Sequence, residues 1–397
     1  MKVLFVNSVC GTGSTGRICT DLASALEKQG NEARIGYGRD SFVPEQFRKY
    51  GIRIGSDIDV KVHGIISRLY DNHGFCSTAA TSRFIDWIKK YDPDIIHLHN
   101  IHGYYLNVET LFDFLKIWEK PVIWTLHDAW PFTGHCVYFD YSGCYKWKTH
   151  CEHCPQKKTY PASFFLDRSR ENFDKKRKIF SGVKKMHLVT PSAWLASCVE
   201  ESFLADYKVT VINNGIDTDV FKPKESSLRE THDLGNKKVI LGVSLGWAPH
   251  KHLDYMVRLA GDLGTEYQVV LIGLSEDQKN NLPSSVIGFE KTRDVDELVE
   301  WYSTANVYVN PTMEDNYPTV NLEAQACGTP VVTFTSGGSA ECIKEGYGLA
   351  VERGDYSKLL EAVKRACELK GRLSFPHIMG KSEFARSYLQ LYKAVLE

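Results

Sequence analysis

Two successive series of short apolar runs, each interleaved with helical patterns, constrain the fold of this chain most strongly. In the first series, Lys2–Val9 precedes a stretch whose apolar residues recur at the spacing of one helix face, and Ala33–Tyr37 follows. A strand, a helix and a strand at this spacing indicate a βαβ unit in a parallel sheet. Further strand-like runs of this series are Ile95–His99, Val122–Leu126 and His187–Thr190.

A second series begins after Asn214 and Gly215, and a polar segment with linker composition, 217–238, precedes its first strand. A chain of 397 residues is long enough for two full cores. We therefore predict an α/β fold of two doubly wound, Rossmann-like parallel-sheet domains, 1–213 and 214–374, with an amphipathic terminal helix in 375–397 that packs back on the first. The strand-like runs of the second series are Val239–Val243, Val269–Ile272, Val307–Val309 and Val331–Phe334.

Charge and hydrophobicity exclude several classes of protein. Lys and Arg number 48 against 49 Asp and Glu, so there is no basic excess of the kind that binds nucleic acid. No run reaches the ~18 apolar residues that span a bilayer. The run Val3–Val6 is shorter than the ~7–15 apolar residues of a signal peptide. We therefore expect a cytoplasmic protein.

Gly11–Gly16 matches the pattern G-x-G-x-x-G between a strand and a helix. Such a loop lets backbone N–H groups approach an anion at the helix N-terminus, and it is typical of NAD(P)-dependent oxidoreductases. That fold also expects an acidic residue about 20 positions further on. Tyr37 and Gly38 stand near that position, and Asp40 comes late. The oxidoreductase interpretation stays open at this point, as does a simple tight turn.

The segment 309–332 is the most informative motif. A strand ends at Pro311, an acidic loop follows, and a helix runs from about Thr319 to Cys327. Asp315 and Glu323 therefore fall at the carboxyl edge of a parallel sheet, which is where doubly wound folds bind ligands. Two carboxylates placed across a helix start can bind sugar and ribose hydroxyls.

This segment resembles the donor-binding motif of the retaining, GT-B-fold nucleotide-sugar glycosyltransferases of family 4. In that motif a pair of acids is followed by Glu-Ala-x-Ala-Cys-Gly-x-Pro-Val-Val, and the second acid of the pair falls on Glu323. The resemblance extends over nearly the whole chain, and the nearest kin are bacterial capsule, colanic-acid or O-antigen transferases. Other matching segments are His97–His99, Thr125–Asp128, Asn214–Asp217, Phe221–Pro223, Gly337–Glu341 and Gly348–Asp355.

The resemblance implies two domains that face each other across a cleft. It also implies an enzyme that moves a sugar from a nucleotide-diphosphate sugar to a surface-polysaccharide acceptor, lipid-linked, with retention of anomeric configuration. The first domain would bind the acceptor and the second the donor. No acidic pair of the D-x-D kind is placed to hold a catalytic metal, so we expect no cofactor for catalysis.

Residue by residue, the resemblance assigns Glu323 to the ribose of the nucleotide. The first acid of the pair falls on Asp315 where the family has Glu, and Glu314 is adjacent, so either carboxylate can meet the donor sugar. Lys251 matches the lysine that neutralises the donor diphosphate. His127 lies near the reacting sugar carbon, where we expect it to position and stabilise charge without acting as a general base.

The arginine that the family places upstream of this lysine is missing, because Leu245 and Gly246 stand near its position. His250, Arg293 and Arg17 are the alternative sources of a second positive charge. The departures at Asp315 and at the arginine leave a non-catalytic nucleotide-sugar-binding protein as an alternative. Further predicted donor-binding residues are Gly13, Ser14, Phe289, Arg293, Glu314, Asn316, Tyr317 and Thr319; the predicted acceptor residues are Asn100, His102 and Tyr104.

A cysteine-rich insertion, 135–155, interrupts the first domain. Cys151 and Cys154 have the C-x-x-C spacing of a zinc knuckle, whereas the spacing of Cys136 and Cys144 is irregular. In a reducing compartment we interpret the cluster either as a structural zinc site or as unliganded thiols in a packed loop. Three histidines could replace a thiol: His135, His150 and His153.

A basic block follows the insertion. Lysines and arginines near anionic headgroups contribute ~1 kcal/mol each, so a few suffice for peripheral docking. We therefore predict contact with the inner membrane surface, with a merely solvated helix face as the alternative. The block consists of Arg168, Arg170, Lys175, Lys176, Arg177, Lys178, Lys184 and Lys185.

Overall fold

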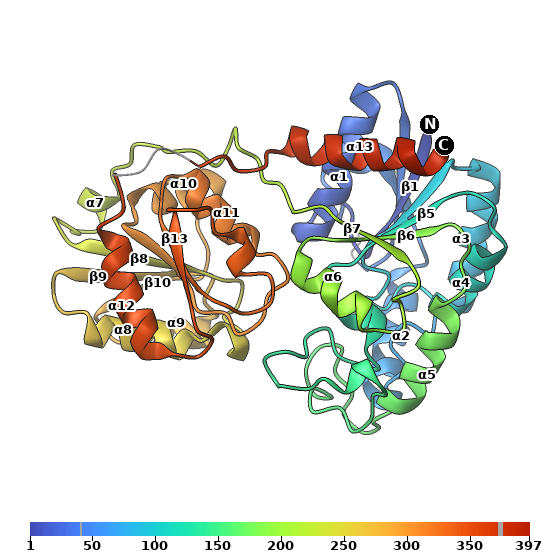
Figure 1. Ribbon diagram of the computed structural model, residues 1–397, viewed down its shortest axis with the longest axis horizontal. Coiled ribbons are helices and arrows are strands. Elements are labelled where there is room, and N and C mark those ends of the chain that lie inside the picture. The colour runs from blue at the N-terminus through green and yellow to red at the C-terminus, as the bar shows by residue number, and fades with distance from the viewer. Residues whose placement is uncertain (40–41, 372–375) are drawn as a thin grey trace. The chain divides into compact units, whose positions relative to one another are not determined.

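The computed structural model describes residues 1–39, 42–371 and 376–397. Contacts divide the chain into two compact units, which are Met1–Ile212 with Ser382–Glu397 (unit 1) and Asn213–Lys381 (unit 2). The predicted domain boundary at 374/375 falls outside the described residues, as does Asp40. Each unit is a parallel sheet flanked by helices (Figure 1).

Unit 1 contains a seven-stranded sheet in the order β3-β2-β1-β4-β5-β6-β7, and every pairing is parallel. The inner strands β4 and β5 are buried throughout, as expected when helices cover both faces of a sheet. The strands are β1 (Lys2–Val6), β2 (Glu32–Tyr37), β3 (Gly51–Arg53), β4 (Ile95–Leu98), β5 (Val122–Thr125), β6 (Met186–Thr190) and β7 (Lys208–Val211). The helices are α1 (Gly13–Lys28), α2 (Asp57–Tyr70), α3 (Thr78–Tyr91), α4 (Val108–Ile117), α5 (Ser169–Phe180), α6 (Ala193–Glu200) and α13 (Lys381–Leu396), with 3-10 turns at Glu45–Tyr50, Trp130–Phe132 and Lys146–Lys148.

Unit 2 contains a six-stranded parallel sheet in the order β10-β9-β8-β11-β12-β13. The order reverses between β8 and β11, and the carboxyl edge at such a switch point is where doubly wound sheets bind ligands. The strands are β8 (Lys238–Val243), β9 (Tyr267–Ile272), β10 (Val286–Phe289), β11 (Val307–Asn310), β12 (Val331–Phe334) and β13 (Gly348–Val351). The helices are α7 (Leu228–Thr231), α8 (Leu253–Asp262), α9 (Glu276–Asn280), α10 (Val295–Thr304), α11 (Thr319–Ala326) and α12 (Tyr356–Cys367), with 3-10 turns at Pro249–Lys251 and Ala340–Cys342.

The predicted fold class, two doubly wound parallel-sheet domains, is confirmed. The apolar runs located the inner strands of both sheets but missed β3, β7, β10 and β13. These four strands are the edges of the two sheets and are mostly half-buried or exposed. An edge strand has less apolar surface to cover, so its sequence lacks the continuous apolar run that marks an inner strand.

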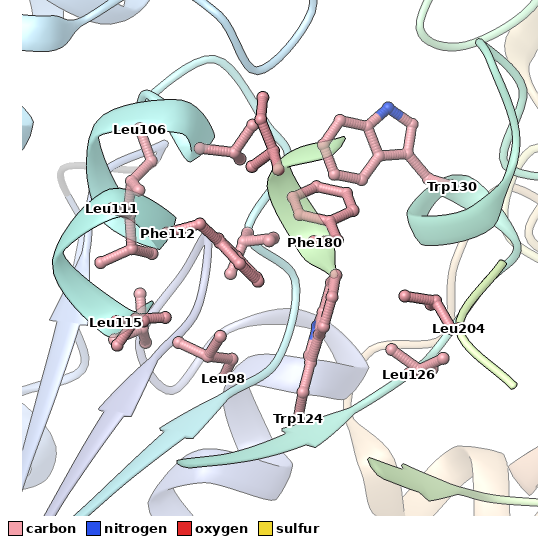
Figure 2. Close-up of a cluster of buried hydrophobic side chains, with 14 of the residues drawn as sticks. Leu98, Leu106, Leu111, Phe112, Leu115, Trp124, Leu126, Trp130, Phe180 and Leu204 are labelled. Atoms are coloured by element: carbon pink, nitrogen blue, oxygen red, sulfur yellow. The ribbon is translucent and has the colours of Figure 1, made fainter. Parts of the chain in front are cut away.

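The core of unit 1 is rich in aromatic side chains. Figure 2 shows Phe112 of α4 and Phe180 of α5 packed over Trp124 of β5, with leucines filling the space around them. The ring centroids of Phe112 and Phe180 lie 4.6 Å apart, and those of Phe112 and Trp124 lie 5.4 Å apart. This packing fixes the strand that leads directly into His127.

Helix α13, red in Figure 1, belongs to unit 1 from its second residue, Ser382, onward. Its Tyr392 hydroxyl lies 2.7 Å from Nδ1 of His97, and its Tyr388 hydroxyl lies 3.1 Å from Oγ1 of Thr125. Both hydrogen bonds are buried and reach the ends of inner strands. The terminal helix is therefore attached by specific polar contacts as well as by its apolar stripe.

Candidate functional site

Lys251 and Asp315 meet at the carboxyl edge of the unit 2 sheet. Lys251 closes the loop after β8, and Asp315 lies in the loop between β11 and α11. The Lys251 Nζ is 2.6 Å from Oδ2 of Asp315, and both side chains are largely but not fully buried. Two side chains that are 64 residues apart in sequence thus form one charged pair at the switch point of the sheet.

Two glycines with positive φ hold the loops that carry this pair. A Cβ at Gly337 would collide with the carbonyl oxygen of Asp315, and the Gly338 N–H donates to that oxygen at 2.9 Å. A Cβ at Gly273 would collide with the carbonyl oxygen of Ser244, at the base of the Lys251 loop. The glycine-rich turn at 337–341 therefore packs directly against the backbone of the acidic loop.

The neighbouring acids lie in different environments. Glu314 is 1% exposed, whereas Asp315 remains partly accessible beside Lys251. Glu323, on α11, is half-buried, and its Oε2 accepts a hydrogen bond from the buried Tyr302 hydroxyl at 3.1 Å. Of the two adjacent acids that the sequence offered for the donor sugar, Asp315 is the one that lies within reach of a ligand.

The loop between Asp315 and α11 turns inward. Asn316 and Tyr317 are buried, and the Tyr317 carbonyl accepts a hydrogen bond from Nδ2 of Asn214 at 3.3 Å. Thr319 begins α11 as predicted, and Pro318 before it supplies no capping side chain. The first-turn backbone donors of α11 therefore have no side-chain cap and can serve an anion.

The other residues predicted for the donor make contacts of their own. Phe289, at the end of β10, packs on Trp301 with ring centroids 5.4 Å apart. Arg293 is largely exposed and pairs with Glu297 at 3.2 Å. Burial, reinforced by the neighbouring Lys251, lowers the pKa of His250 to about 4. This pKa favours the neutral imidazole of His250 near pH 7.

In unit 1, His127 follows β5 and stacks on His99, which follows β4. Nε2 of His127 is 2.9 Å from Nδ1 of His99, and the two rings are 15° from parallel. Burial lowers the pKa of His127 to about 4, and the nearby Asp128 only partly opposes this. Burial also lowers the pKa of His99 well below its usual range. Both imidazoles are therefore neutral near pH 7.

Of the predicted acceptor residues, His102 contacts Asp128. His102 Nε2 is 2.8 Å from Oδ2 of Asp128, and its Nδ1 is 3.1 Å from the Tyr160 hydroxyl. Burial alone would raise the pKa of Asp128, but His102 and the Trp130 N–H together hold it below its usual value. The backbone N–H of Asn100 donates a hydrogen bond to Oδ1 of Asn7 at 3.2 Å. Tyr104 stands in a left-handed backbone conformation, φ 69°, with its ring 4.7 Å from that of His73.

Gly13 begins α1, and Ser14 follows in its first turn. No atom lies within 4 Å of a Cβ built at Gly13, so the helix start is open, and Thr12 before it makes no side-chain cap. Gly11 is the crowded member of the loop, because a Cβ there would lie 2.7 Å from the Phe47 ring. The glycine motif thus combines a tight turn with an open helix N-terminus.

The four insertion cysteines line one small cavity together with His135. All are free thiols, and among the described residues no group of three or more His, Cys, Asp or Glu side chains is arranged to hold a metal ion as the side chains stand. His150 instead pairs with Asp174 at 2.9 Å. The interpretation of the cluster as a zinc site stays a prediction at this stage.

Lys176 is not part of a solvated basic face, and this expectation was wrong. Its Nζ is buried, donates to the carbonyls of Trp130 and Thr133 at 2.8 and 3.1 Å, and lies 3.6 Å from the Trp130 ring centroid. Burial lowers the pKa of Lys176 to about 7. The run of charged residues did not reveal the burial of Lys176, because Lys176 lies on the face of α5 that is turned toward the core.

Sequence reasoning assigned no role to Tyr160, Tyr302 or Asp71, and it placed the two tyrosines of α13 only on the apolar stripe of that helix. Each of the first three contacts a predicted residue through a hydrogen bond that joins distant parts of the chain, and the two tyrosines contact His97 and Thr125. The sequence could have identified His99, because it is the last residue of the segment His97–His99, which matches the family.

Comparison with known proteins identifies the family. The sequence model described as "Glycosyltransferase Family 4" matches residues 15–220, more than half of the 397-residue chain. The model described as "Glycosyl transferases group 1" matches residues 237–368. The chain belongs to glycosyltransferase family 4. This assignment displaces the oxidoreductase interpretation of the glycine-rich loop.

The chain is 26% identical over 378 residues to WcaC of Escherichia coli (strain K12), whose name places it among the glycosyl transferases of colanic acid biosynthesis; the match covers 92% of this chain and 90% of WcaC. Solved structures with the same fold include sucrose-phosphate synthase from Thermosynechococcus elongatus, with a TM-score of 0.70 and 17% identity over 99% of this chain and 98% of that one. Another is Anabaena HepE in complex with UDP, with a TM-score of 0.63 and 14% identity over 100% and 97%. The fold of this family 4 glycosyltransferase is therefore GT-B.

Across the part of the chain that the structure describes, no helix combines the length and the apolar character needed to cross a membrane.

Proposed function

We propose that this enzyme transfers a sugar from a nucleotide-diphosphate sugar to a growing, lipid-linked surface polysaccharide, with retention of anomeric configuration. The Lys251–Asp315 pair at the switch point of the unit 2 sheet is the observation that carries the proposal. A cation, an accessible carboxylate and an uncapped helix start lie together there, and Glu323 is on the same helix. These groups suit a diphosphate, a sugar and a ribose respectively.

Related proteins support the donor class. A solved structure of Anabaena HepE holds UDP-glucose, and this chain has the same fold. The name of WcaC connects that protein with colanic acid, a polysaccharide.

The roles of the unit 2 residues follow from their chemistry. On donor binding, Lys251 exchanges part of its interaction with Asp315 for the donor phosphates and stabilises the charge that develops on the leaving diphosphate. Asp315 then accepts hydrogen bonds from sugar hydroxyls, and Glu323, held by Tyr302, accepts those of the ribose. No protein general base is required, because an oxygen of the leaving phosphate can accept the proton of the acceptor hydroxyl.

Unit 1 supplies the acceptor side in this proposal. The neutral His127 donates or accepts a hydrogen bond near the reacting carbon without carrying a formal charge. The hydrogen-bonded set of Tyr160, His102 and Asp128 offers fixed polar groups for hydroxyls of an acceptor glycan. Its contribution is placement of the reacting groups.

The test is release of nucleoside diphosphate across a panel of UDP-, GDP- and dTDP-sugars, with and without a lipid-linked oligosaccharide acceptor. We expect turnover with one donor class and a strong loss in Glu323→Gln, while Glu361→Gln, at an exposed position of α12, keeps wild-type activity. Nucleotide binding without turnover on any donor would instead support a binding-only protein. The anomeric configuration of the product, read by NMR, tests retention separately.

We further propose that unit 1 docks on the inner membrane surface through the tip Phe164–Leu166, where Phe165 is 71% exposed. Hydrogen bonds hold this tip in place, including one from the Phe164 N–H to the Arg68 carbonyl at 2.8 Å. Exposed basic residues, Lys158 and Arg170 among them, lie close to it in sequence. Apolar side chains that insert between headgroups and cations that meet anionic lipid together give peripheral binding.

Flotation with vesicles tests this docking surface. We expect the full chain to float with anionic vesicles at low salt, less with neutral ones, and Phe165→Ser to stay in the soluble fraction. Ile117→Ser removes an equally exposed apolar side chain of unit 1 and should float normally. A wild-type chain that stays soluble with anionic vesicles would contradict the proposal.

A further inference from the structure

The cysteine-rich insertion gathers its sulfur atoms in one place without the help of regular secondary structure. Between Thr133 and Ser169 the only element is the short 3-10 turn Lys146–Lys148. Cys136, Cys144, Cys151, Cys154 and His135 nevertheless line a single cavity of about 10 Å³. A volume of this size admits one water molecule or one ion and excludes an organic ligand.

The sulfur atoms in this cavity accept hydrogen bonds. The Gly134 N–H donates to Sγ of Cys151 at 3.2 Å, and the thiol of Cys136 donates to the sulfur of Cys154. The Gln156 backbone N–H also donates to Cys154. Gly134 has no room for a side chain, because a Cβ there would collide with the Ser169 carbonyl oxygen. These contacts hold Cys136, Cys151 and Cys154 in place around the cavity.

His135 provides an independent observation. Its side chain is 0% exposed, its Nδ1 lies 2.5 Å from Oδ1 of Asp71, and its Nε2 is buried without a hydrogen-bond partner. Asp71 is itself fixed, since its other carboxylate oxygen accepts the Arg168 N–H at 2.8 Å. An orphaned nitrogen at a cavity lined by thiols is costly unless something binds it. A histidine whose far nitrogen contacts a carboxylate is the usual arrangement of a zinc-ligating imidazole.

A buried cation lies beside the cavity. Three thiolates and one Zn²⁺ leave a net charge of −1, and the buried Asp71 carboxylate adds a second negative charge, which is expensive to bury alone. Lys176 lies next to the same segment, with its Nζ donating to the Thr133 carbonyl, and the Thr133 hydroxyl donates to the Cys136 carbonyl at 2.6 Å. A buried ammonium at this place offsets part of the negative charge.

We propose that this cavity binds one zinc ion, with Nε2 of His135 and three thiolates of the four cysteines as its ligands. Zinc is the metal that mixed sulfur and imidazole donors in a closed tetrahedral site select. Since no finished coordination shell stands among the described side chains, binding requires the thiols to turn toward the ion. The ion then links 135–154 into one unit.

The insertion is also close in sequence to a residue that contacts one of the predicted acceptor residues of unit 1. Tyr160 follows the last cysteine closely in sequence, and its hydroxyl contacts His102. The zinc site stands independently of the proposed transferase reaction, because its assay measures metal and not turnover.

The first experiment is metal analysis of the full chain, purified without chelators. We expect about one zinc per chain, and a content below roughly 0.2 would overturn the proposal because structural sites bind tightly. Replacement of zinc by Co²⁺ should give the sulfur-to-cobalt charge-transfer absorption and the intense visible bands of a tetrahedral site. An octahedral cobalt spectrum would also contradict it.

Variants then identify the ligands. His135→Gln and three of the four Cys→Ser variants should each lose zinc, while Cys198→Ser, a buried thiol of α6, should retain it. If all four Cys→Ser variants lose zinc and His135→Gln keeps it, the site is a four-thiolate one and the role given to His135 is wrong. The wild-type metal content and cobalt spectrum need no variant, so they decide the proposal even where a variant misfolds.

Discussion

In unit 2, the residues that follow β8 and β11 form a charged pair, whereas in unit 1 the residues that follow β4 and β5 are two stacked imidazoles. Both positions lie at the carboxyl edge of a doubly wound parallel sheet. Lys251 and Asp315 keep partial access to solvent, as does the half-buried His127, whereas His99 is buried; desolvation lowers the pKa of both imidazoles, so that they are neutral near pH 7. The same topology thus presents an ion pair of a lysine and a carboxylate in one unit, and two neutral imidazoles beside the Asp128 carboxylate in the other.

The largest expected effect tests the charged side of this comparison. Lys251→Ala should lower kcat by about 10²–10³-fold, because one charge-stabilising group at the leaving diphosphate is lost. Lys279→Ala, which removes an exposed lysine of the same unit, serves as the control. Release of nucleoside diphosphate is the measurement. An unchanged rate in Lys251→Ala would mean that the charged pair at the carboxyl edge of the unit 2 sheet has no part in the reaction.

A second prediction concerns the support of the acidic loop. Gly337→Ala should destabilise unit 2 by about 1–3 kcal/mol and weaken donor binding, because the new Cβ pushes on the Asp315 carbonyl. Gly235→Ala is the matched control, since Gly235 also has positive φ but open space around its Cβ position. Urea unfolding and nucleotide titration measure the two effects; equal losses in both variants would attribute them to backbone strain alone.

A third prediction uses the neutral imidazoles. The folded pKa of His127, about 4, lies below its ordinary value of 6.5, so the unfolded chain binds more protons between these two values. The contribution of His127 to stability is therefore fully present above about pH 6.5 and is lost as the pH falls toward 4. His63, also in unit 1, shifts in the same direction to about 4.

Hydrogen exchange at pH 7 and pH 5 separates the units. Amides of β4 and β5 should lose more protection on acidification than those of β8 and β11, and His127→Gln should reduce the loss. If the protection of both sheets fell equally, the buried imidazoles would not govern the acid response of unit 1.

The smallest expected effect concerns α13. Tyr392→Phe removes one buried hydrogen bond to His97 and should lower the free energy of unfolding of unit 1 by about 1 kcal/mol. The urea midpoint measures it, with Tyr347→Phe in unit 2 as the control, because the buried Tyr347 hydroxyl has no hydrogen-bond partner. If Tyr392→Phe lost no more stability than Tyr347→Phe, α13 would be held by apolar packing alone.

Sequence patterns predicted the inner strands and the position of α11 closely, since Thr319–Ala326 is the helix expected from about Thr319 to Cys327. They failed at β3, β7, β10 and β13, where an edge position relaxes the apolar pattern. They also placed Lys176 on a basic surface. Spacing along one helix cannot show that a lysine will find two carbonyls and a tryptophan ring inside the fold.

By itself, the sequence determined the two parallel-sheet units and the family, because buried strands and the glycine-punctuated motif 309–332 depend on local chemistry. Only the tertiary structure decided that Lys251 pairs with Asp315, that Glu314 is buried beside it, and that the imidazole of His135 contacts Asp71. The two contacts join residues that are distant in sequence, and the difference in burial distinguishes two residues that are adjacent. The burial of a charged side chain and the choice of its partner depend on which strands become neighbours, and that is set by the packing of the whole unit.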